Sequence, residues 1–238
     1  MKTKFIICLF LFFFVSLSSN AQNADFNMTG GITVDAFVPT FTDNTALTTA
    51  SWTTLTSSPH AVSRSCCTFV TVNDTGYVYQ FGGGSAALLT NVAKYNVRTS
   101  AWTNSVSVIP FQMSAATSIN VKDSLIYIFG GNTPTLGKTL KYNVITNTWT
   151  TLADMSSSPC TDALVLKYRD SLIYVIGGGD GIFGANTFNA VRLYNRNTNT
   201  WSTPGANYPL NCAMMGGGIY GDTIISAAGW TGTVGTAN

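Results

Sequence analysis

A pattern of about 50 residues is repeated along this chain, and it constrains the fold more than any other feature. In each copy a short apolar stretch ends in two glycines, and a tyrosine and a tryptophan follow. The glycine pairs begin at Gly82, Gly130 and Gly177, 48 and 47 residues apart. A period of this length is typical of architectures that stack one small unit several times. The tryptophans with this spacing are Trp52, Trp102, Trp149 and Trp201.

The three complete copies also share their internal spacing. The tyrosine precedes the tryptophan by seven residues, and an Asn-x-x-Thr lies between them, in the pairs Tyr95/Trp102, Tyr142/Trp149 and Tyr194/Trp201. Because Asn and Thr favour turns, we predict that the two aromatic residues belong to successive strands of a hairpin. An aspartate begins each apolar stretch and is interpreted as a turn residue, at Asp74, Asp123, Asp170 and Asp222.

The apolar stretches have the character of strands. Residues 173–176 are β-branched or aromatic and lie between Asp-Ser and Gly-Gly, which is the pattern of a short buried strand. A glycine pair suits a strand end where the backbone passes close to another sheet or takes a positive φ. Outside residues 1–21 no stretch keeps a 3.6-residue apolar period, and the chain contains no glutamate. We therefore expect an all-β fold.

These motifs resemble the kelch repeat over roughly residues 51–238. The resemblance implies a kelch-type β-propeller of four-stranded antiparallel blades. The positions that carry it are Gly82, Gly83, Gly130, Gly131, Gly177, Gly178 and the three Tyr/Trp pairs. The fourth copy departs from the pattern, since Ser226 replaces the strand tyrosine and Trp230 stands where the second glycine is expected.

The repeats are expected at about 66–112, 113–160 and 161–210, with a partial repeat at 211–238. Their innermost strands are expected near 66–72, 113–121, 161–168 and 211–219. Two arrangements account for the half-written fourth unit. The strand around Trp52 completes it and closes a ring of four, or further repeats follow Asn238. We favour the second, an incomplete propeller, because propellers of the kelch family usually have six or seven blades.

The first 21 residues have the features of a signal peptide. Lys2 and Lys4 precede an apolar run over 5–17, and small residues follow up to Ala21. The run is shorter than the ~20 residues that a membrane-spanning helix needs. We therefore expect cleavage after Ala21, export from the cell and no membrane span in the mature chain. Residues 22–50 are expected to form a linker or strand segment, with a degenerate blade as the alternative.

The net charge of the mature chain argues against one class of partner, and the positions of the cysteines bear on disulfide pairing. Removing Lys2 and Lys4 leaves 12 − 2 = 10 basic side chains against 10 aspartates, without a basic cluster, so we expect no nucleic-acid partner. Cys160 and Cys212 occupy equivalent positions in adjacent repeats. Facing sheets lie about 10 Å apart, farther than a disulfide spans, so buried thiols are favoured over a bridge. A bridge between Cys66 and Cys67 is a less favoured alternative.

The resemblance to the kelch family raises two kinds of sugar-active enzyme. Copper-radical oxidases use two His, two Tyr and a Tyr–Cys crosslink, whereas His60 is the one histidine of this chain. Sialic-acid mutarotases are the second kind, and no pair of carboxylates here marks acid–base catalysis. We predict no catalytic residue, metal site or cofactor. The alternative is a fragment of such an enzyme whose catalytic residues lie outside this chain.

Kelch propellers gather two sets of loops on one face, around the mouth of the central channel. Here these are the loops after the glycine pairs, about 84–91, 132–138 and 179–190, and those between blades, about 57–65, 103–112, 153–160 and 202–211. Arg64 stands out, because an arginine next to an innermost strand could hold an acidic group near the axis. We predict an exported, non-catalytic module that binds a protein or glycan partner here. The candidate residues are His60, Arg64, Asp154, Asp180, Phe183 and Tyr208.

Overall fold

The structure is a computed structural model that describes residues 26–28, 32–34, 54–84, 87–132, 136–155, 160–181, 186–227 and 229–231. The chain divides into two units, Met1–Thr53 and Thr54–Asn238. In the first unit, β1 (Phe26–Met28) pairs antiparallel with β2 (Ile32–Val34). The predicted signal peptide and Trp52 lie outside the described residues.

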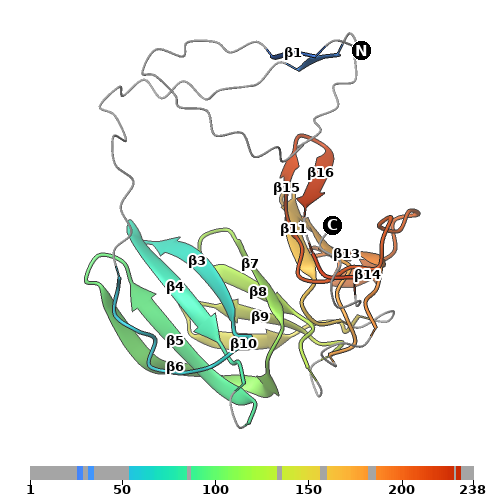
Figure 1. The fold of residues 1–238 in the computed structure, drawn as a ribbon. Helices are drawn as coiled ribbons and strands as arrows, with labels where there is room; N and C mark the ends of the chain where they lie inside the picture. Colours follow the sequence, from blue (N-terminus) through green and yellow to red (C-terminus); the bar gives the residue numbers. More distant parts are fainter. Residues whose placement is uncertain are drawn as a thin grey trace. The chain divides into compact units, whose positions relative to one another are not determined.

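The second unit consists of antiparallel sheets in which the strand order follows the sequence (Figure 1). Blade 1 comprises β3 (Cys66–Val72), β4 (Thr75–Phe81), β5 (Leu89–Asn96) and β6 (Ala101–Met113). Blade 2 comprises β7 (Thr117–Val121), β8 (Leu125–Phe129), β9 (Thr139–Asn143) and β10 (Thr148–Thr151). Blade 3 comprises β11 (Leu164–Tyr168), β12 (Leu172–Ile176), β13 (Val191–Asn195) and β14 (Thr200–Ser202). Blade 4 has β15 (Gly216–Tyr220) and β16 (Thr223–Ala227).

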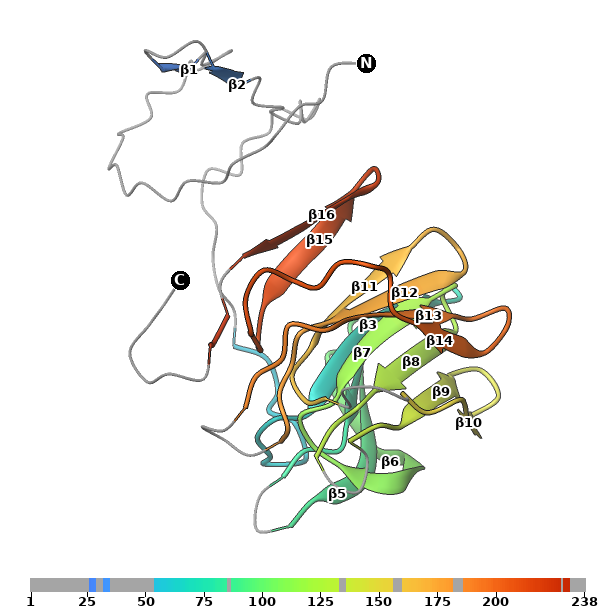
Figure 2. The same ribbon diagram turned by 90° about the vertical axis from the view of Figure 1, so that its right-hand side faces the viewer.

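The first strand of each blade lies against the first strand of the next. β3 contacts β7, β7 contacts β11, and β11 contacts β15. In Figure 2 these first strands lie toward the centre of the arrangement of blades, and the later strands of each blade lie farther out. The predicted all-β fold with four-stranded blades is confirmed, and the arrangement is an open propeller. Among the described residues there is no helix long and apolar enough to cross a bilayer.

Three of the four predicted innermost strands need a later start. Strand β3 has the predicted bounds, but β7, β11 and β15 begin later than expected. The reason is a residue with positive φ two positions before each strand, which turns the chain into the blade; these residues are Ala115, Asp162 and Met214.

The loop predicted at 103–112 is the larger error, because these residues continue strand β6 up to Met113. β6 pairs only with β5 and its register shifts twice along the pairing. Pro110 lies between the paired positions Val108 and Met113. An edge strand with bulges tolerates a proline, so Pro110 does not end the strand here.

The tyrosine and tryptophan of each complete repeat are direct partners across a hairpin, as predicted. Tyr95 faces Trp102, Tyr142 faces Trp149 and Tyr194 faces Trp201. The asparagine after each tyrosine shapes the turn, since its Oδ1 accepts hydrogen bonds from the backbone N–H groups two and three residues further on. The repeated aspartates lie in the turns between the first and second strands, which confirms their structural interpretation.

The same aromatic cluster joins successive blades. Phe81 of blade 1 packs edge-on against Tyr142 and Trp149 of blade 2, with ring centroids 5.8 and 5.9 Å away. Phe129 of blade 2 packs in the same way against Tyr194 and Trp201 of blade 3, at 5.8 and 5.5 Å. Edge-on aromatic pairs at this separation are favourable beyond the area that they bury. The repeated aromatic residues therefore fix each sheet on the one before it.

The tryptophan of each outer strand also donates a hydrogen bond to the preceding segment. Trp149 Nε1 donates to Ser107 Oγ at 3.0 Å, and Trp201 Nε1 donates to the Ala153 carbonyl at 2.9 Å. Trp102 Nε1 donates to the Thr56 carbonyl at 2.9 Å. Thr56 follows position 52 by four residues, as Ala153 follows Trp149. Thr56 therefore occupies on blade 1 the place that Ala153 occupies on blade 3.

The glycine pairs are needed because the backbones of adjacent blades meet there. A Cβ on the first glycine of the pair, at Gly130, would overlap the Cys160 carbonyl oxygen, and its φ of 66° is unfavourable for other residues. The N–H of the second glycine, Gly131, donates to the same carbonyl at 3.0 Å. The other two pairs make the same contacts with the carbonyls of Met113 and Cys212.

The fourth repeat aligns one residue away from the sequence-based expectation. The turn between β15 and β16 has two residues, Gly221 and Asp222, whereas the corresponding turn of blade 3 has three. As a result Ile225, and not Ser226, occupies the position of the strand tyrosine Tyr174.

The shorter turn also changes the interpretation of Trp230. Gly229, with a φ of 124°, takes the position of the second glycine. Trp230 forms a two-way backbone bridge with Ala213, as Gly179 does with Thr161. Trp230 therefore follows the glycine position instead of replacing the glycine.

Candidate functional site

Four residues around the centre of the arrangement of blades form what we call the axial ring: Arg64, Ala115, Asp162 and Met214. Each lies two residues before a first strand and has a φ between 51° and 58°. Backbone hydrogen bonds join them in order, since the N–H groups of Ala115, Asp162 and Met214 each donate to the carbonyl of the preceding member at 2.7 to 2.8 Å. The ring therefore connects all four blades through backbone atoms, and its side chains differ from blade to blade.

Two ring members form an ion pair between blades 1 and 3. Arg64 Nη2 lies 2.5 Å from Asp162 Oδ2, and the two side chains are 27% and 18% exposed. The Arg64 Nε is buried and has no hydrogen-bond partner. The acidic group that was expected beside Arg64 is thus Asp162 of the chain itself.

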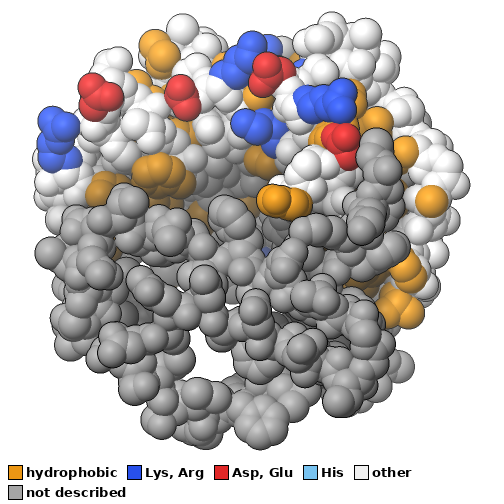
Figure 3. Space-filling view, turned by 90° about the horizontal axis from the view of Figure 1, so that it is seen from above, with side chains coloured by type: hydrophobic (Ala, Val, Ile, Leu, Met, Phe, Trp, Pro, Cys, Tyr) orange, Lys and Arg blue, Asp and Glu red, His pale blue; other side chains and the backbone are white. Residues whose placement is uncertain are grey.

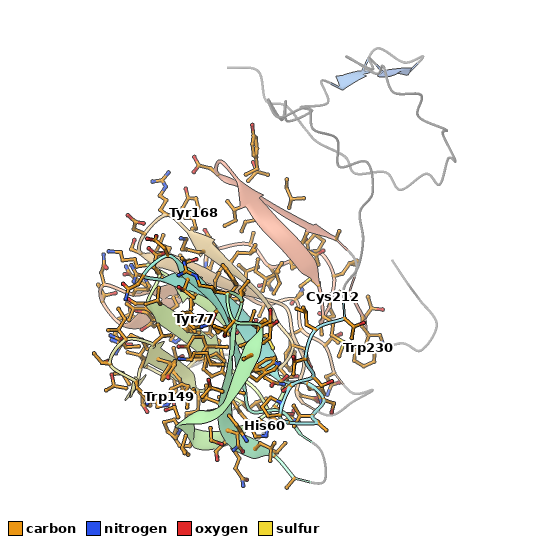
Figure 4. All side chains as sticks on the ribbon, turned by 90° about the vertical axis from the view of Figure 1, so that its left-hand side faces the viewer. His60, Tyr77, Trp149, Tyr168, Cys212 and Trp230 are labelled. Carbon is orange, nitrogen blue, oxygen red and sulfur yellow. The ribbon has the colours of Figure 1, made fainter. Side chains whose placement is uncertain are left out.

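A small pocket, the axial pocket, opens beside this ion pair toward blade 4. Besides the pair, Asn186 and Trp230 contribute large polar or aromatic side chains. Asn186 holds the loop after the third glycine pair, because its Nδ2 donates to Asp180 Oδ2 at 3.0 Å. Figure 4 shows Trp230 next to Cys212. Cys212 lies at the start of the fourth repeat, directly before Ala213, with which Trp230 forms a backbone bridge. The lining residues are Arg64, Thr161, Asp162, Gly179, Gly181, Asn186, Ala213, Met214 and Trp230.

Of the other predicted ligand-face residues, those that the structure describes do not line this pocket. Asp154 forms an ion pair with Lys138, with 2.5 Å between Oδ2 and Nζ. The His60 Nε2 is buried without a hydrogen-bond partner. Tyr208 packs on the apolar cluster between blades 3 and 4, and its OH accepts a hydrogen bond from Ser226. Asp180 lies between two lining glycines, and Phe183 lies outside the described residues.

Comparison with known proteins places these repeats in a family. The family model of the kelch motif matches residues 113–156 and 169–204. The chain is a kelch-repeat protein. Its fold is similar to a solved structure titled "Structure of YjhT", with a TM-score of 0.63 and 19% sequence identity. The match covers 75% of this chain and 63% of that chain, so the chain spans less than two thirds of that protein. No curated protein matched the sequence.

Sequence reasoning missed several residues of the kelch propeller's axial pocket. Asp162 has the same position in the third repeat as Arg64 has in the first. An alignment of the repeats would therefore have placed the two residues at equivalent positions. Trp230 was assigned to the neighbouring position for the reason given above. Asn186 and Met214 lack a sequence signal, because an asparagine in a loop and a methionine beside a strand are ordinary residues there.

Three of the four described cysteines, Cys66, Cys160 and Cys212, are buried, whereas Cys67 is exposed. Burial raises the pKa of Cys66 to about 12, and it also raises the pKa of Cys160 and of Cys212. Cys66, Cys67 and Cys160 are free thiols, and the Cys212 thiol donates to the Ala213 carbonyl. A raised pKa keeps a thiol neutral and weakly nucleophilic. Among the described residues, no group of three His, Cys or acidic side chains could hold a metal.

The charged side chains at the surface are mixed in sign. Where Figure 3 shows described atoms, Lys and Arg side chains lie close to Asp side chains, without a large patch of one charge. The axial pocket has the same balance, with one guanidinium and one carboxylate. The pocket itself has a volume of only about 10 Å³, so these groups, with an amide and an indole, can contact a partner at its mouth but do not enclose one.

Proposed function

We propose that this chain is part of an exported, non-catalytic kelch propeller that binds a protein or glycan partner at the axial pocket. The observation that carries the proposal is the Arg64–Asp162 ion pair at the centre of the propeller face. The mature chain is expected to be nearly neutral, with one histidine and no glutamate. This composition favours recognition over acid–base catalysis.

The ion pair is not required by the fold. The corresponding ring positions in the other blades hold an alanine and a methionine, although all four have the same backbone conformation. A partly buried ion pair contributes little net stability, because removing both charges from water offsets much of their attraction. Placing both charges at the mouth of the propeller therefore favours a role in recognition.

The neighbouring groups indicate the chemistry of the partner. The Asp162 carboxylate can accept hydrogen bonds from hydroxyl or peptide N–H groups, and the Asn186 amide can both accept and donate them. The Trp230 indole offers an apolar face. A sugar or a polar peptide segment presents these features together.

The binding test uses the mature protein on a glycan array and in a pull-down with proteins of the cell envelope. Two ring variants, Arg64→Gln and Asp162→Asn, are compared with Asp154→Asn, which removes a surface ion pair outside the pocket. We expect each ring variant to weaken binding at least tenfold, which corresponds to about 1.4 kcal/mol, and the control to bind normally. Thermal unfolding of all three variants separates lost binding from lost folding.

The outcomes distinguish the candidate functions. Loss of glycan binding alone, or of protein binding alone, identifies the class of partner. Equal weakening by the control variant would contradict the axial pocket as the site. Turnover of a sugar without stable binding would replace the proposal by a sugar-active enzyme.

Export has its own test. If the leader is removed as proposed, the secreted protein begins at Gln22, and N-terminal sequencing detects this directly. Retention of residues 1–21 in the mature protein would contradict export through cleavage.

A further inference from the structure

A buried arginine between blades 2 and 3 lies outside the axial pocket. Arg192, in β13, is 1% exposed, and none of the ion pairs among the described residues includes it. The residue two before the repeated tyrosine is Ala93 in blade 1 and Leu140 in blade 2, both fully buried. The fold therefore accepts an apolar side chain at this position, and the charge in blade 3 has another cause.

The Arg192 guanidinium uses only part of its hydrogen-bonding capacity. Nη1 donates to the carbonyls of Gly177 and Val175, at 3.0 and 3.4 Å. Nε and Nη2 are buried, and no described residue forms a hydrogen bond with them. Burial lowers the pKa of the guanidinium, yet an arginine keeps its proton in proteins. A buried positive charge with unused N–H groups is unfavourable unless a negative group compensates it.

A buried hydroxyl faces the same interface between blades 2 and 3. Arg192 is the cross-strand partner of Val175, and Thr139 is the partner of Phe129. Val175 and Phe129 belong to one apolar cluster between these blades, and cross-strand partners project from the same face of a sheet. The Thr139 Oγ1 is also buried, and it has no hydrogen-bond partner in the part of the chain that the structure describes.

A thiol completes this group of donors. Cys160 is fully buried in the same cluster. It lies close to Gly178, where a Cβ would come within 2.8 Å of the Cys160 Cβ, and Gly178 follows the carbonyl that Arg192 binds. Burial raises the pKa of the thiol, so Cys160 offers a neutral S–H group. Arg192, Thr139 and Cys160 thus bring N–H, O–H and S–H donors to one interface.

We infer that a halide ion, chloride under ordinary conditions, binds between blades 2 and 3 against Arg192. A monatomic anion accepts hydrogen bonds from any direction and needs little space, so it suits a closed interface lined by donors. A carboxylate or phosphate ligand would require a wider opening. The bound ion compensates the guanidinium charge and links the two blades. This inference is independent of the proposed function.

The first test measures thermal unfolding in sodium chloride and in sodium gluconate at equal ionic strength. A ligand that binds only the folded state raises the melting temperature. We expect chloride to raise it by about 2–4 °C, the size of a 1 kcal/mol effect in a domain of this length. Arg192→Leu, which copies the residue of blade 2, should remove the difference between the salts. Arg196→Leu, a change in an exposed turn of the same blade, should keep it.

The second test uses crystals of the unmodified protein grown in sodium bromide. Anomalous scattering should show a bromide beside Arg192 and Thr139. This measurement stands even where Arg192→Leu fails to fold. A water molecule or no density at this position would overturn the inference, and so would equal melting temperatures in the two salts or a chloride effect that survives in Arg192→Leu.

Discussion

The interface between blades 1 and 2 and the interface between blades 2 and 3 are built from corresponding residues. Phe81, Tyr142 and Trp149 in the first have the same contacts as Phe129, Tyr194 and Trp201 in the second. The glycine pairs meet the same type of carbonyl in both. The second interface alone of these two contains a buried arginine, where the first has Leu140.

This difference separates two kinds of position. Where an aromatic side chain or the missing Cβ of a glycine pair contacts the neighbouring blade, the residue repeats, because every blade must pack on the next. Where corresponding residues differ, as at Arg192 or in the axial ring, the fold does not determine the choice. Such positions are the ones at which a function specific to this chain is expected.

The largest effect is expected from breaking the contact that both interfaces share. In Gly130→Val the new side chain would collide with the Cys160 carbonyl, in a backbone conformation that valine avoids. We expect a loss exceeding about 4 kcal/mol and no folded protein in urea titrations. Gly205→Ala is the control, because a Cβ there meets nothing within 4 Å. A folded Gly130→Val protein would show that the blades do not meet as described.

Removing the central aromatic ring of each interface tests their equivalence. Phe81→Ala and Phe129→Ala should each reduce the free energy of unfolding by about 3 kcal/mol, through lost burial and a cavity. Both rings are fully buried, so we expect losses within about 1 kcal/mol of each other. Denaturant unfolding gives both values. A loss in one variant only would contradict the equivalence of the interfaces.

The tryptophan hydrogen bonds predict a smaller difference between the interfaces. Trp201→Phe leaves the Ala153 carbonyl without its donor, whereas Trp149→Phe leaves a serine hydroxyl that rotates toward other partners. We expect losses of about 1.5 and 0.5 kcal/mol in the free energy of unfolding. The reverse order would show that the ring contacts, and not the N–H donors, determine the cost.

The smallest effect is expected at the exposed link between blades 3 and 4. Hydrogen bonds from Tyr168 and Arg169 lower the pKa of Asp222 below its ordinary value of 3.8. A carboxylate with a lowered pKa stabilises the fold above that ordinary value, and the contribution is lost as the pH falls through the folded-state pKa. Asp222→Asn should therefore melt slightly earlier at pH 7 and coincide with the unmodified protein in strong acid. A difference that persists in acid would contradict this assignment.

The repeat made most of the fold predictable from the sequence. The Tyr/Trp hairpins, the turn aspartates and the glycine pairs are local patterns, and the same physics acts on every copy. The errors arose where one copy departs from the others. The two-residue turn at Gly221 and Asp222 shifted the alignment of the fourth repeat by one residue. In blade 1 the bulged edge strand β6 continues through Pro110, where a loop was predicted.

The candidate site was less predictable, because it depends on contacts across the axis. Arg64 was identified from its place beside a first strand, but its partner Asp162 lies 98 residues further on in another blade. No local pattern connects two such residues. Asp154 and Tyr208 have partners near their own loops instead, so membership of a loop on the predicted face did not bring them to the pocket.

The central claim is that backbone hydrogen bonds at the glycine pairs and the axial ring connect each blade to the next. Amide hydrogen exchange measured by NMR tests it most directly, at Gly83, Gly131, Gly178, Ala115, Asp162 and Met214. We expect these amides to be protected almost as strongly as those of the central strands. Gly83 donates to the carbonyl of Met113, the last residue of β6, where the chain leaves blade 1, and each of the other five donates to a carbonyl of a segment that leads into another blade. Exchange as fast as that of exposed turn amides without a hydrogen bond would contradict the account.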